Sequence, residues 1–471
     1  MSGFGHRQRV LSNGLTVHVL DMPHLHSAYV AYLVRVGSRH ERPEENGISH
    51  FLEHMLFRGC DGYPDTQALN GAIEDLGGSL DGFTTRDYTG YATAVHPDGL
   101  RPALEILGQM MRTPHLRGLT TERRVVREEM LDALDERGRL IEVDALAHEH
   151  LFGGHRLGQR IEGLRRNLPH FSRDALHRHR RRHYTGANSV LCIAGRIDRP
   201  TERSVERAFG PLPAGQRRSD GNRPPVAHSP ASMRIRRHRS PQTRVRFSFR
   251  TVPEVHRDFP ALVWLRRWLD GGLSAHLQTE LVHRLGLAYE VSASLDSYSD
   301  VGLFDIELAV ENDRLPRAVE ALGTLVGDVV RREFSTEEIR RVQERYRSSF
   351  EFMFDSPSEL TGWFGVASLF GHDETPRDRL QRVLAVEPGD VQRAVTRLFD
   401  LRRLAVTGVG GADPTTIRAA RRALARWSES RRAARGGIRG CSGGAPASRT
   451  GSVASAPAGG AGQGGRPVRL L

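Results

Sequence analysis

The segment HFLEH at residues 50–54 places two histidines and a glutamate close together in the sequence. The surrounding residues 46–59 predict a short helix that ends at a glycine. At about 100° per residue, His50, Glu53 and His54 share one face of this helix. The opposite face is apolar, with Ile48, Leu52, Met55 and Leu56.

Two imidazoles one helical turn apart can bind a single zinc ion, and a catalytic zinc needs a third protein ligand and an open position. The carboxylate of Glu53, on the same face, could take the proton from an attacking water. The order H-x-x-E-H is the inverse of the common zincin motif. The chain has 22 histidines, so these five residues alone leave ordinary surface or core histidines open as an alternative.

The elements that would position this helix occur twice along the chain. Each block reads as a strand, two helices and a strand pair, at an offset of roughly 209–215 residues. In order, the paired segments are 28–36 and 245–249, 47–57 and 260–269, helices ending near Gly77 and Gly286, and strand pairs across 79–96 and 288–310. This pattern predicts an internal duplication of an α+β unit.

Composition bounds the class of protein. A chain of 471 residues with 38% hydrophobic and 26% charged residues can form two to four folded domains. The net charge of +12 comes from 68 basic residues, all of them arginine, and part of the excess lies in an acid-free stretch from residue 431. This pattern argues against a nucleic-acid partner.

Neither an apolar run of roughly 18 residues nor a secretory leader is seen in the sequence. The three cysteines are far apart and suit a reducing compartment, so we expect no membrane partner and a cytoplasmic location.

Shifts in composition predict the domain boundaries. Residues 211–243 are rich in Pro, Ser and Arg, which is typical of a linker. Residues 431–471 are dominated by Gly, Ala, Ser and Arg, which predicts a disordered tail. We therefore expect a catalytic zinc-binding domain at 1–210 and a homologous domain without zinc at 244–430, because the second block has no histidine in its equivalent helix.

The string VGSRHERPEENGISHFLEHMLFRG, which contains the HFLEH segment, resembles the pitrilysin/insulinase family of inverted-zincin metallopeptidases. It is most similar to the shorter branch, which includes mitochondrial processing peptidase and its bacterial relatives. Further similar segments are LSNGLTVHVL, IEDLGGSLDGFTTRDYTGYATAV, TERRVVREEM, RRHYTGANSVLCIAGRID and RLGLAYEVSAS. The resemblance extends over roughly residues 8–420.

This resemblance implies a processing-peptidase-like α+β fold. Two homologous halves, each a mixed or antiparallel sheet flanked by helices, would form a clam-like chamber. It implies a zinc-dependent endopeptidase that hydrolyses short or unfolded polypeptides, with one Zn²⁺ per chain. By resemblance, His50, His54 and Glu129 hold the metal, Glu53 is the catalytic base, and Glu122 is a supporting carboxylate that orients a ligating histidine.

The resemblance also points to substrate-binding residues and to two departures. Asp81 and Gly82 stand where the family usually has Asn-Ala on its substrate-binding edge strand, and Asp81 would add a negative charge near the zinc. Tyr289 matches the tyrosine of an Arg/Tyr pair that holds substrate. Val282 stands where the arginine belongs, and Arg284 would face about 200° away on a helix. A heterodimer with a zinc-less homologue that supplies the Arg/Tyr pair would explain this departure, and so would a self-sufficient homodimer that uses a different cation.

A non-catalytic scaffold or assembly subunit of the same family is the alternative function. Such relatives tend to lose the zinc residues, all of which are present in this chain. Tyr289 could also be an ordinary aromatic packed in the core. His177, His179 and His183 lie among arginines, which could indicate a metal or anion site, but the pattern favours a solvated, positively charged helix end.

Overall fold

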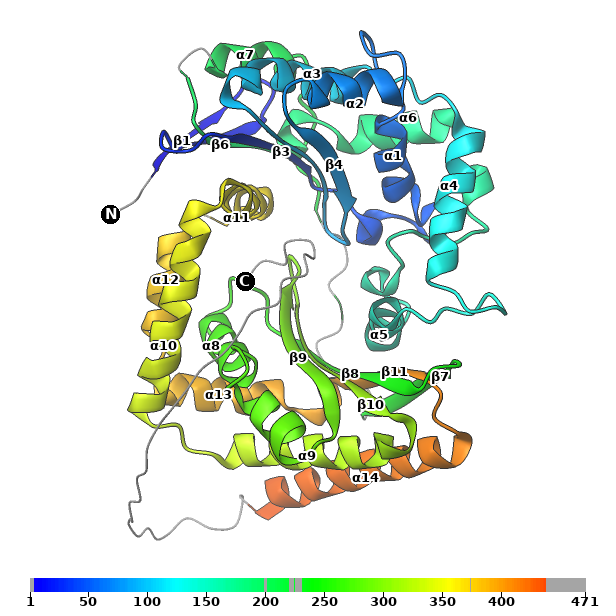
Figure 1. Cartoon of the computed structure of the whole chain (residues 1–471), viewed down its shortest axis with the longest axis vertical. Helices are drawn as coiled ribbons and strands as arrows, with labels where there is room; N and C mark the ends of the chain where they lie inside the picture. The colour runs from blue at the N-terminus through cyan, green and yellow to red at the C-terminus, as the bar shows by residue number, and fades with distance from the viewer. Residues whose placement is uncertain (1–3, 199–200, 220–223, 225–230, 373, 438–471) are drawn as a thin grey trace.

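The computed structural model describes residues 4–198, 201–219, 224, 231–372 and 374–437 as two halves, each built on one sheet (Figure 1). The first sheet has the strand order β1-β2-β6-β3-β5-β4, and the second has β7-β11-β8-β10-β9. The strands of the first sheet are β1 (Gly5–Val10), β2 (Thr16–Asp21), β3 (Ala28–Val34), β4 (Ser79–Thr84), β5 (Thr89–Val95) and β6 (Ser189–Gly195). Those of the second are β7 (Ser232–Arg237), β8 (Gln242–Thr251), β9 (Ala288–Ser297), β10 (Gly302–Glu311) and β11 (Leu404–Gly410).

Helices flank both sheets and follow the amphipathic segments of the sequence. The first half contains α1 (Ile48–Leu56), α2 (Thr66–Glu74), α3 (Leu100–Arg112), α4 (Leu119–Asp132), α5 (Val143–Phe152), α6 (Arg173–His183) and α7 (Thr201–Phe209). The second contains α8 (Phe259–Leu269), a π-helical turn (Gln278–Arg284), α9 (Leu315–Arg331), α10 (Thr336–Glu351), α11 (Pro357–Phe370), α12 (Pro376–Leu384), α13 (Pro388–Leu398) and α14 (Pro414–Gly437). The fold is therefore the predicted α+β fold of two sheet-based halves.

The two sheets share one pattern of strand pairing. In the first, β2 and β6 are parallel and the pairs β6–β3, β3–β5 and β5–β4 are antiparallel. In the second, β7 and β11 are parallel and the pairs β11–β8, β8–β10 and β10–β9 are antiparallel. Strand β1 is an addition at the edge of the first sheet. The matching connectivity is what an internal duplication produces.

The predicted boundaries need two changes. Residues 232–237, inside the segment 211–243 that was expected to be a linker, form β7 and pair along β11. Their sequence SMRIRR has few apolar residues because an edge strand buries little, so composition alone did not predict a strand. At the other end, α14 runs to Gly437, beyond the expected start of the tail at 431. The remainder of that predicted tail lies outside the described residues.

Each half also contributes a helix to the face of the other half's sheet. Helix α11, from the C-terminal half of the sequence, packs against β2, β3 and β6 of the first sheet. Helix α5, from the N-terminal half, packs against β8 and β11 of the second (Figure 1). The domains predicted at 1–210 and 244–430 are thus completed by helices that are exchanged between them.

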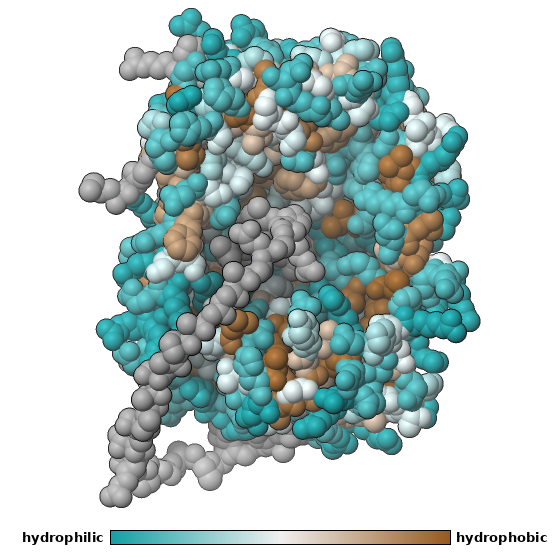
Figure 2. Space-filling model, viewed as in Figure 1, coloured by the Kyte–Doolittle hydropathy of each residue, from teal (hydrophilic) through white to brown (hydrophobic). Residues whose placement is uncertain are grey.

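The halves also meet through a buried ion pair. The guanidinium of Arg39 donates to Asp87 in the β4–β5 turn at 2.9 Å and to Asp300 in the β9–β10 turn at 2.9 and 3.1 Å. Asp87 and Asp300 occupy equivalent turns of the duplicated unit. Arg39 is 1% exposed, so this contact fixes the two hairpin ends together. The surface is hollowed between the halves (Figure 2), in a clam-like arrangement.

None of the described helices is both long and apolar enough to cross a lipid bilayer.

Candidate metal centre

Helix α1 is anchored at its N-terminus by a buried carboxylate. Glu41 accepts hydrogen bonds from the backbone N–H groups of Gly47 (2.7 Å) and Ser49 (2.8 Å) and from the side chain of Asn46 (2.9 Å). These interactions satisfy donors that a helix start leaves free. Gly47 has φ +102°, and a Cβ there would lie 2.6 Å from the carbonyl oxygen of Glu162. Burial raises the pKa of Glu41 to about 7.

His50 and His54 of α1 and Glu129 of α4 come together at one point. The two Nε2 atoms of the histidines are 3.3 Å apart. The Glu129 carboxylate oxygens lie 3.5 Å from Nε2 of His50 and 3.4 Å from Nε2 of His54. Tetrahedral ligand atoms ~2.0–2.1 Å from a zinc ion would be ~3.4 Å from one another, so the three residues fit that geometry.

Among the described residues, this is the one group of three or more His, Cys, Asp or Glu side chains whose ligand atoms all lie within 4.8 Å. Glu129 is the most exposed of the three, which leaves a side of the site open to solvent.

Glu122 lies behind His54 on the same helix as Glu129. Its Oε1 accepts a hydrogen bond from Nδ1 of His54 at 2.9 Å, and its Oε2 is 3.5 Å from the guanidinium of Arg58. Burial by itself would lower the pKa of His54, but hydrogen bonds to Glu122 and Glu129 outweigh this effect and raise the pKa to about 10. The hydrogen bond from Nδ1 of His54 to Glu122 orients the ring so that Nε2 faces the other two ligand atoms. The equivalent nitrogen of His50, Nδ1, is buried and has no hydrogen-bond partner among the described residues.

Glu53 lies beside the three ligand atoms but belongs to a different set of contacts. It is 7% exposed, and its Oε2 accepts a hydrogen bond from the hydroxyl of Thr84 in β4 at 2.9 Å. Burial raises the pKa of Glu53 above its ordinary value, against the opposing effect of His50 and of the Thr84 hydrogen bond. A carboxylate with these properties is suited to accept and return a proton.

Strand β4 passes next to Glu53 and has a free edge. Within the described sheet it pairs with β5 alone. A Cβ on Gly82 would lie 2.8 Å from Oε1 of Glu53 and 2.7 Å from the ring of Phe57, so the glycine provides the space that Glu53 occupies.

Asp81 is exposed and, by the alternation of a strand, points to the face of the sheet opposite Glu53. It raises the pKa of Tyr29 on that opposite face, after burial of the phenol. The prediction that Asp81 adds a negative charge near the metal site is therefore wrong, because its side chain lies on the other face of the sheet.

In the second half, Tyr289 lies at the start of β9 with 91% of its surface exposed, which excludes the core aromatic as an interpretation. Val282 packs against the hydrophobic core of that half. Arg284 is exposed and forms an ion pair with Glu280. The structure does not bring any of these three residues to the histidine pair through a described contact.

The histidines of α6 differ from the prediction of a solvated helix end. His179 and His183 are buried, at 8% and 5% exposure, and Nε2 of His179 lies 3.1 Å from the hydroxyl of Ser49 on α1. Between them, Arg181 and Arg182 are exposed, as predicted, whereas Arg180 is half-buried and donates to the carbonyl oxygens of Met111 and Arg112. The contact between Thr84 and Glu53 was not predicted from the sequence. The position of Thr84, two residues after Gly82 on one strand face, was the available signal.

Comparison with known proteins agrees with this geometry. The profile described as "Insulinase (Peptidase family M16)" matches residues 16–164, and that of "Peptidase M16 inactive domain" matches residues 170–346. The chain belongs to the M16 peptidase family. The resemblance to the pitrilysin/insulinase family is thereby confirmed.

M16 relatives of similar length include zinc proteases and a processing-peptidase subunit. The uncharacterised zinc protease YmxG of Bacillus subtilis is 27% identical over 82% of this chain and 94% of its own. A probable mitochondrial-processing peptidase subunit beta of Arabidopsis thaliana is 26% identical over 86% of this chain and 78% of its own. Among solved structures, a protease from Helicobacter pylori has the same fold, with a TM-score of 0.79 and 19% identity over 86% of this chain and 99% of that chain.

Proposed function

We propose that this M16 chain is a zinc-dependent endopeptidase that cleaves short or unfolded polypeptides. The observation that carries the proposal is the meeting of His50, His54 and Glu129, whose ligand atoms are 3.3–3.5 Å apart, with the buried Glu53 beside them. The relatives named as zinc proteases support the choice of metal. The presence of all three proposed zinc ligands and of the proposed base Glu53 argues against the alternative of a non-catalytic scaffold.

His50, His54 and Glu129 would hold the zinc ion, and Glu122 would fix the tautomer and orientation of His54. When bound, zinc supplies a Lewis acid that polarises the carbonyl of the scissile peptide bond. Glu53 takes the proton from the attacking water at a carboxylate oxygen and returns it to the leaving amine. The hydrogen bond from Thr84 keeps that carboxylate in one orientation during both transfers.

The free edge of β4 is the proposed substrate site. An extended peptide would add as a further strand there and be held through main-chain hydrogen bonds. Gly82 would face the catalytic side of this strand, and Asp81 would contact substrate side chains on the other side. Tyr289, exposed on β9, is the proposed substrate contact from the second half.

The proposed substrate site lacks the arginine expected seven residues before Tyr289, because Val282 stands there and packs, half-buried, against the hydrophobic core. We propose that the chain works as a dimer, either with a second copy or with a zinc-less homologue that supplies an Arg/Tyr pair. Relatives named as subunits support this assembly. Mass measurement of the native complex, purified from its own host, distinguishes the two forms, and a strictly monomeric active enzyme would contradict both.

The variant Glu53→Gln tests the activity. We expect it to bind one zinc ion per chain and to cleave a fluorogenic unfolded peptide about 10²- to 10⁴-fold more slowly, because the carboxamide cannot accept the proton. Glu128→Gln is the matched control, since Glu128 is exposed and should leave cleavage unchanged. Removal of zinc with a chelator should abolish cleavage, and added zinc should restore it. A purified wild-type chain that holds no zinc and cleaves nothing would support the scaffold instead.

A further inference from the structure

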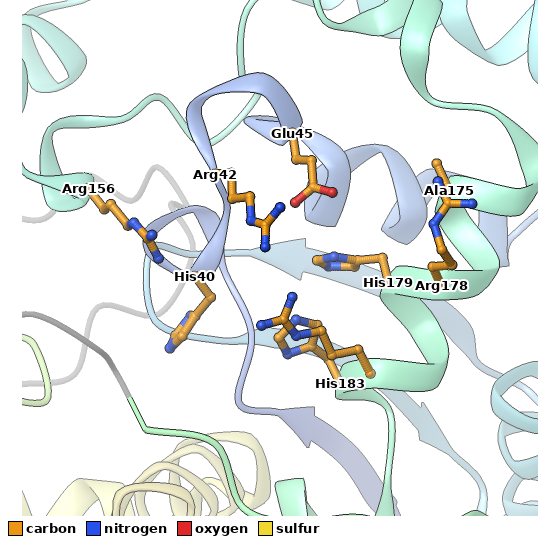
Figure 3. A pocket seen from close by; sticks show the side chains of 9 residues that line it. His40, Arg42, Glu45, Arg156, Ala175, Arg178, His179 and His183 are labelled. Carbon is orange, nitrogen blue, oxygen red and sulfur yellow. The ribbon is translucent and has the colours of Figure 1, made fainter.

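A cavity of about 370 Å³ lies behind the zinc-ligand helix, between α6 and the segment 40–45 that leads into α1 (Figure 3). Its walls carry four arginines and three histidines against one acid, Glu45. Pockets of ~300–1,000 Å³ hold small organic ligands, so the volume exceeds what a single water or ion needs.

The floor of the cavity is a pair of buried imidazoles. His179 and His183 lie one turn apart on α6, with ring centroids 4.7 Å apart. His179 is engaged by Ser49. His183 is 5% exposed, and its Nδ1 is buried without a hydrogen-bond partner in the described part of the chain.

The rim is a set of unpaired cations. Arg42 and Arg156 come from loops on one side of the cavity, and Arg178 and Arg182 from α6 on the other. Among the described residues, none of these four guanidinium groups forms an ion pair or side-chain hydrogen bond. Burial above all, and then the charges of His179, His40 and Arg182, lower the pKa of His183 to about 2. The cluster therefore holds positive charge that no part of the described protein neutralises.

These features exclude a metal ion as the occupant. The three histidines of the cavity do not form a group whose ligand atoms all lie within 4.8 Å, in the described residues, and the surrounding guanidinium groups repel a cation. Planar guanidinium forks instead match the oxygen atoms of a phosphate group.

We propose that this cavity binds a small phosphate-bearing molecule, with guanidinium groups of the rim holding the phosphate oxygens above the imidazole floor. The site is distinct from the metal centre, and the proposal does not rest on peptidase activity. Nothing in the zinc chemistry described above uses these residues.

Calorimetric titration of the full-length, zinc-loaded chain at constant ionic strength tests the proposal. Inorganic phosphate and a sugar phosphate are the probes, and succinate and chloride are the comparison anions. We expect both phosphates to bind with a defined stoichiometry and to raise the melting temperature, and succinate and chloride to do neither. Tighter binding of the sugar phosphate identifies an organic ligand, and equal binding identifies inorganic phosphate. Binding of succinate as tight as that of phosphate would overturn the assignment.

Variants that are expected to weaken or to tighten phosphate binding test whether the ligand binds in this cavity. The double variant Arg178→Gln/Arg182→Gln should weaken phosphate binding about tenfold or more, because charge-assisted hydrogen bonds are lost. Glu45→Gln should tighten it, since it removes the single acid of the cavity wall. Arg181→Gln is the matched control: Arg181 is exposed on the same helix but does not line the cavity, and its variant should bind within about twofold of wild type. Equal weakening in the control and the double variant would overturn the proposal.

Discussion

Thr84 restrains the carboxylate that matters most for the proposed chemistry. Glu53 is on a helix and Thr84 is on the neighbouring edge strand, so their hydrogen bond ties the orientation of the base to the strand that would receive the substrate. A carboxylate held by a single hydroxyl keeps its second oxygen, Oε1, available for a proton. Thr84 is a positioning residue in this arrangement.

Replacement Thr84→Val removes the hydroxyl while it keeps the shape of the side chain. We expect kcat for peptide cleavage to fall about tenfold to a hundredfold, as loss of a hydrogen bond to a charged group implies, with little change in KM or zinc content. Thr84→Ser keeps the hydroxyl and should stay within a few-fold of wild type. If the valine variant has wild-type kcat, Thr84 has no positioning role.

The metal-site residues illustrate what sequence can and cannot predict at this scale. His50, Glu53 and His54 lie within one helical turn, so their common face followed from helical periodicity. Glu129 required the family resemblance, because nothing local indicates which distant carboxylate will arrive. The resemblance placed the charge of Asp81 near the zinc, but neighbours in a strand face opposite ways, and it is Gly82 that lies on the side of Glu53.

At the scale of elements, α4 combines two tasks in one helix. Glu122 and Glu129 are seven residues apart, or about two turns, so both face α1. Glu122 reaches the far side of the His54 ring while Glu129 reaches its near side. The alignment of α4 with α1 therefore sets both the ligand geometry and the support behind it.

Glu122→Gln separates the two tasks. The carboxamide keeps the size of the side chain but loses the charge that favours the correct tautomer of His54, so we expect zinc affinity to fall about 10- to 100-fold. The dissociation constant can be measured by competition with a chromophoric chelator. Glu128→Gln lies on the exposed face of the same helix and serves as the control. Identical zinc affinity in both variants would contradict the supporting role of Glu122.

Two elements show where composition fails as a guide to structure. Strand β7 has the sequence of a linker, because its residues pair through backbone hydrogen bonds at a sheet edge and bury few side chains. The end of α6 looks solvated, but two of its histidines point inward between exposed arginines. In both cases a neighbouring element that is remote in sequence decides the burial.

At the scale of the whole molecule, the exchange of α5 and α11 joins the halves through their hydrophobic cores. Leu33 and Cys192 of the first sheet and Phe364 of α11 belong to one buried apolar cluster that also contains much of the second half. The largely apolar sequence of α11 is consistent with a buried helix, but nothing in it indicates which sheet it covers.

At Gly365, helix α11 lies directly against the side chains of the first sheet. A Cβ there would lie 2.6 Å from Leu33 and 3.1 Å from the sulfur of Cys192. We expect Gly365→Leu to lower the free energy of unfolding by about 1–3 kcal/mol through overpacking, as measured by urea denaturation. Gly362, three residues earlier on α11, has open space around it, so Gly362→Leu should be neutral or slightly stabilising. Equal effects of the two substitutions would show that α11 is not tightly seated.

The exchanged helices define which parts of the chain can move as rigid bodies. Helix α11 must travel with the first sheet and α5 with the second, so a motion that widens the space between the halves cannot divide the molecule at its sequence midpoint. It has to bend the connections on both sides of those helices, among them residues 133–142 and 352–356, while the Arg39 contacts hold the two hairpin ends together. Those short connections, rather than the segment between the two halves of the sequence, then limit how far the two halves of the chain can separate.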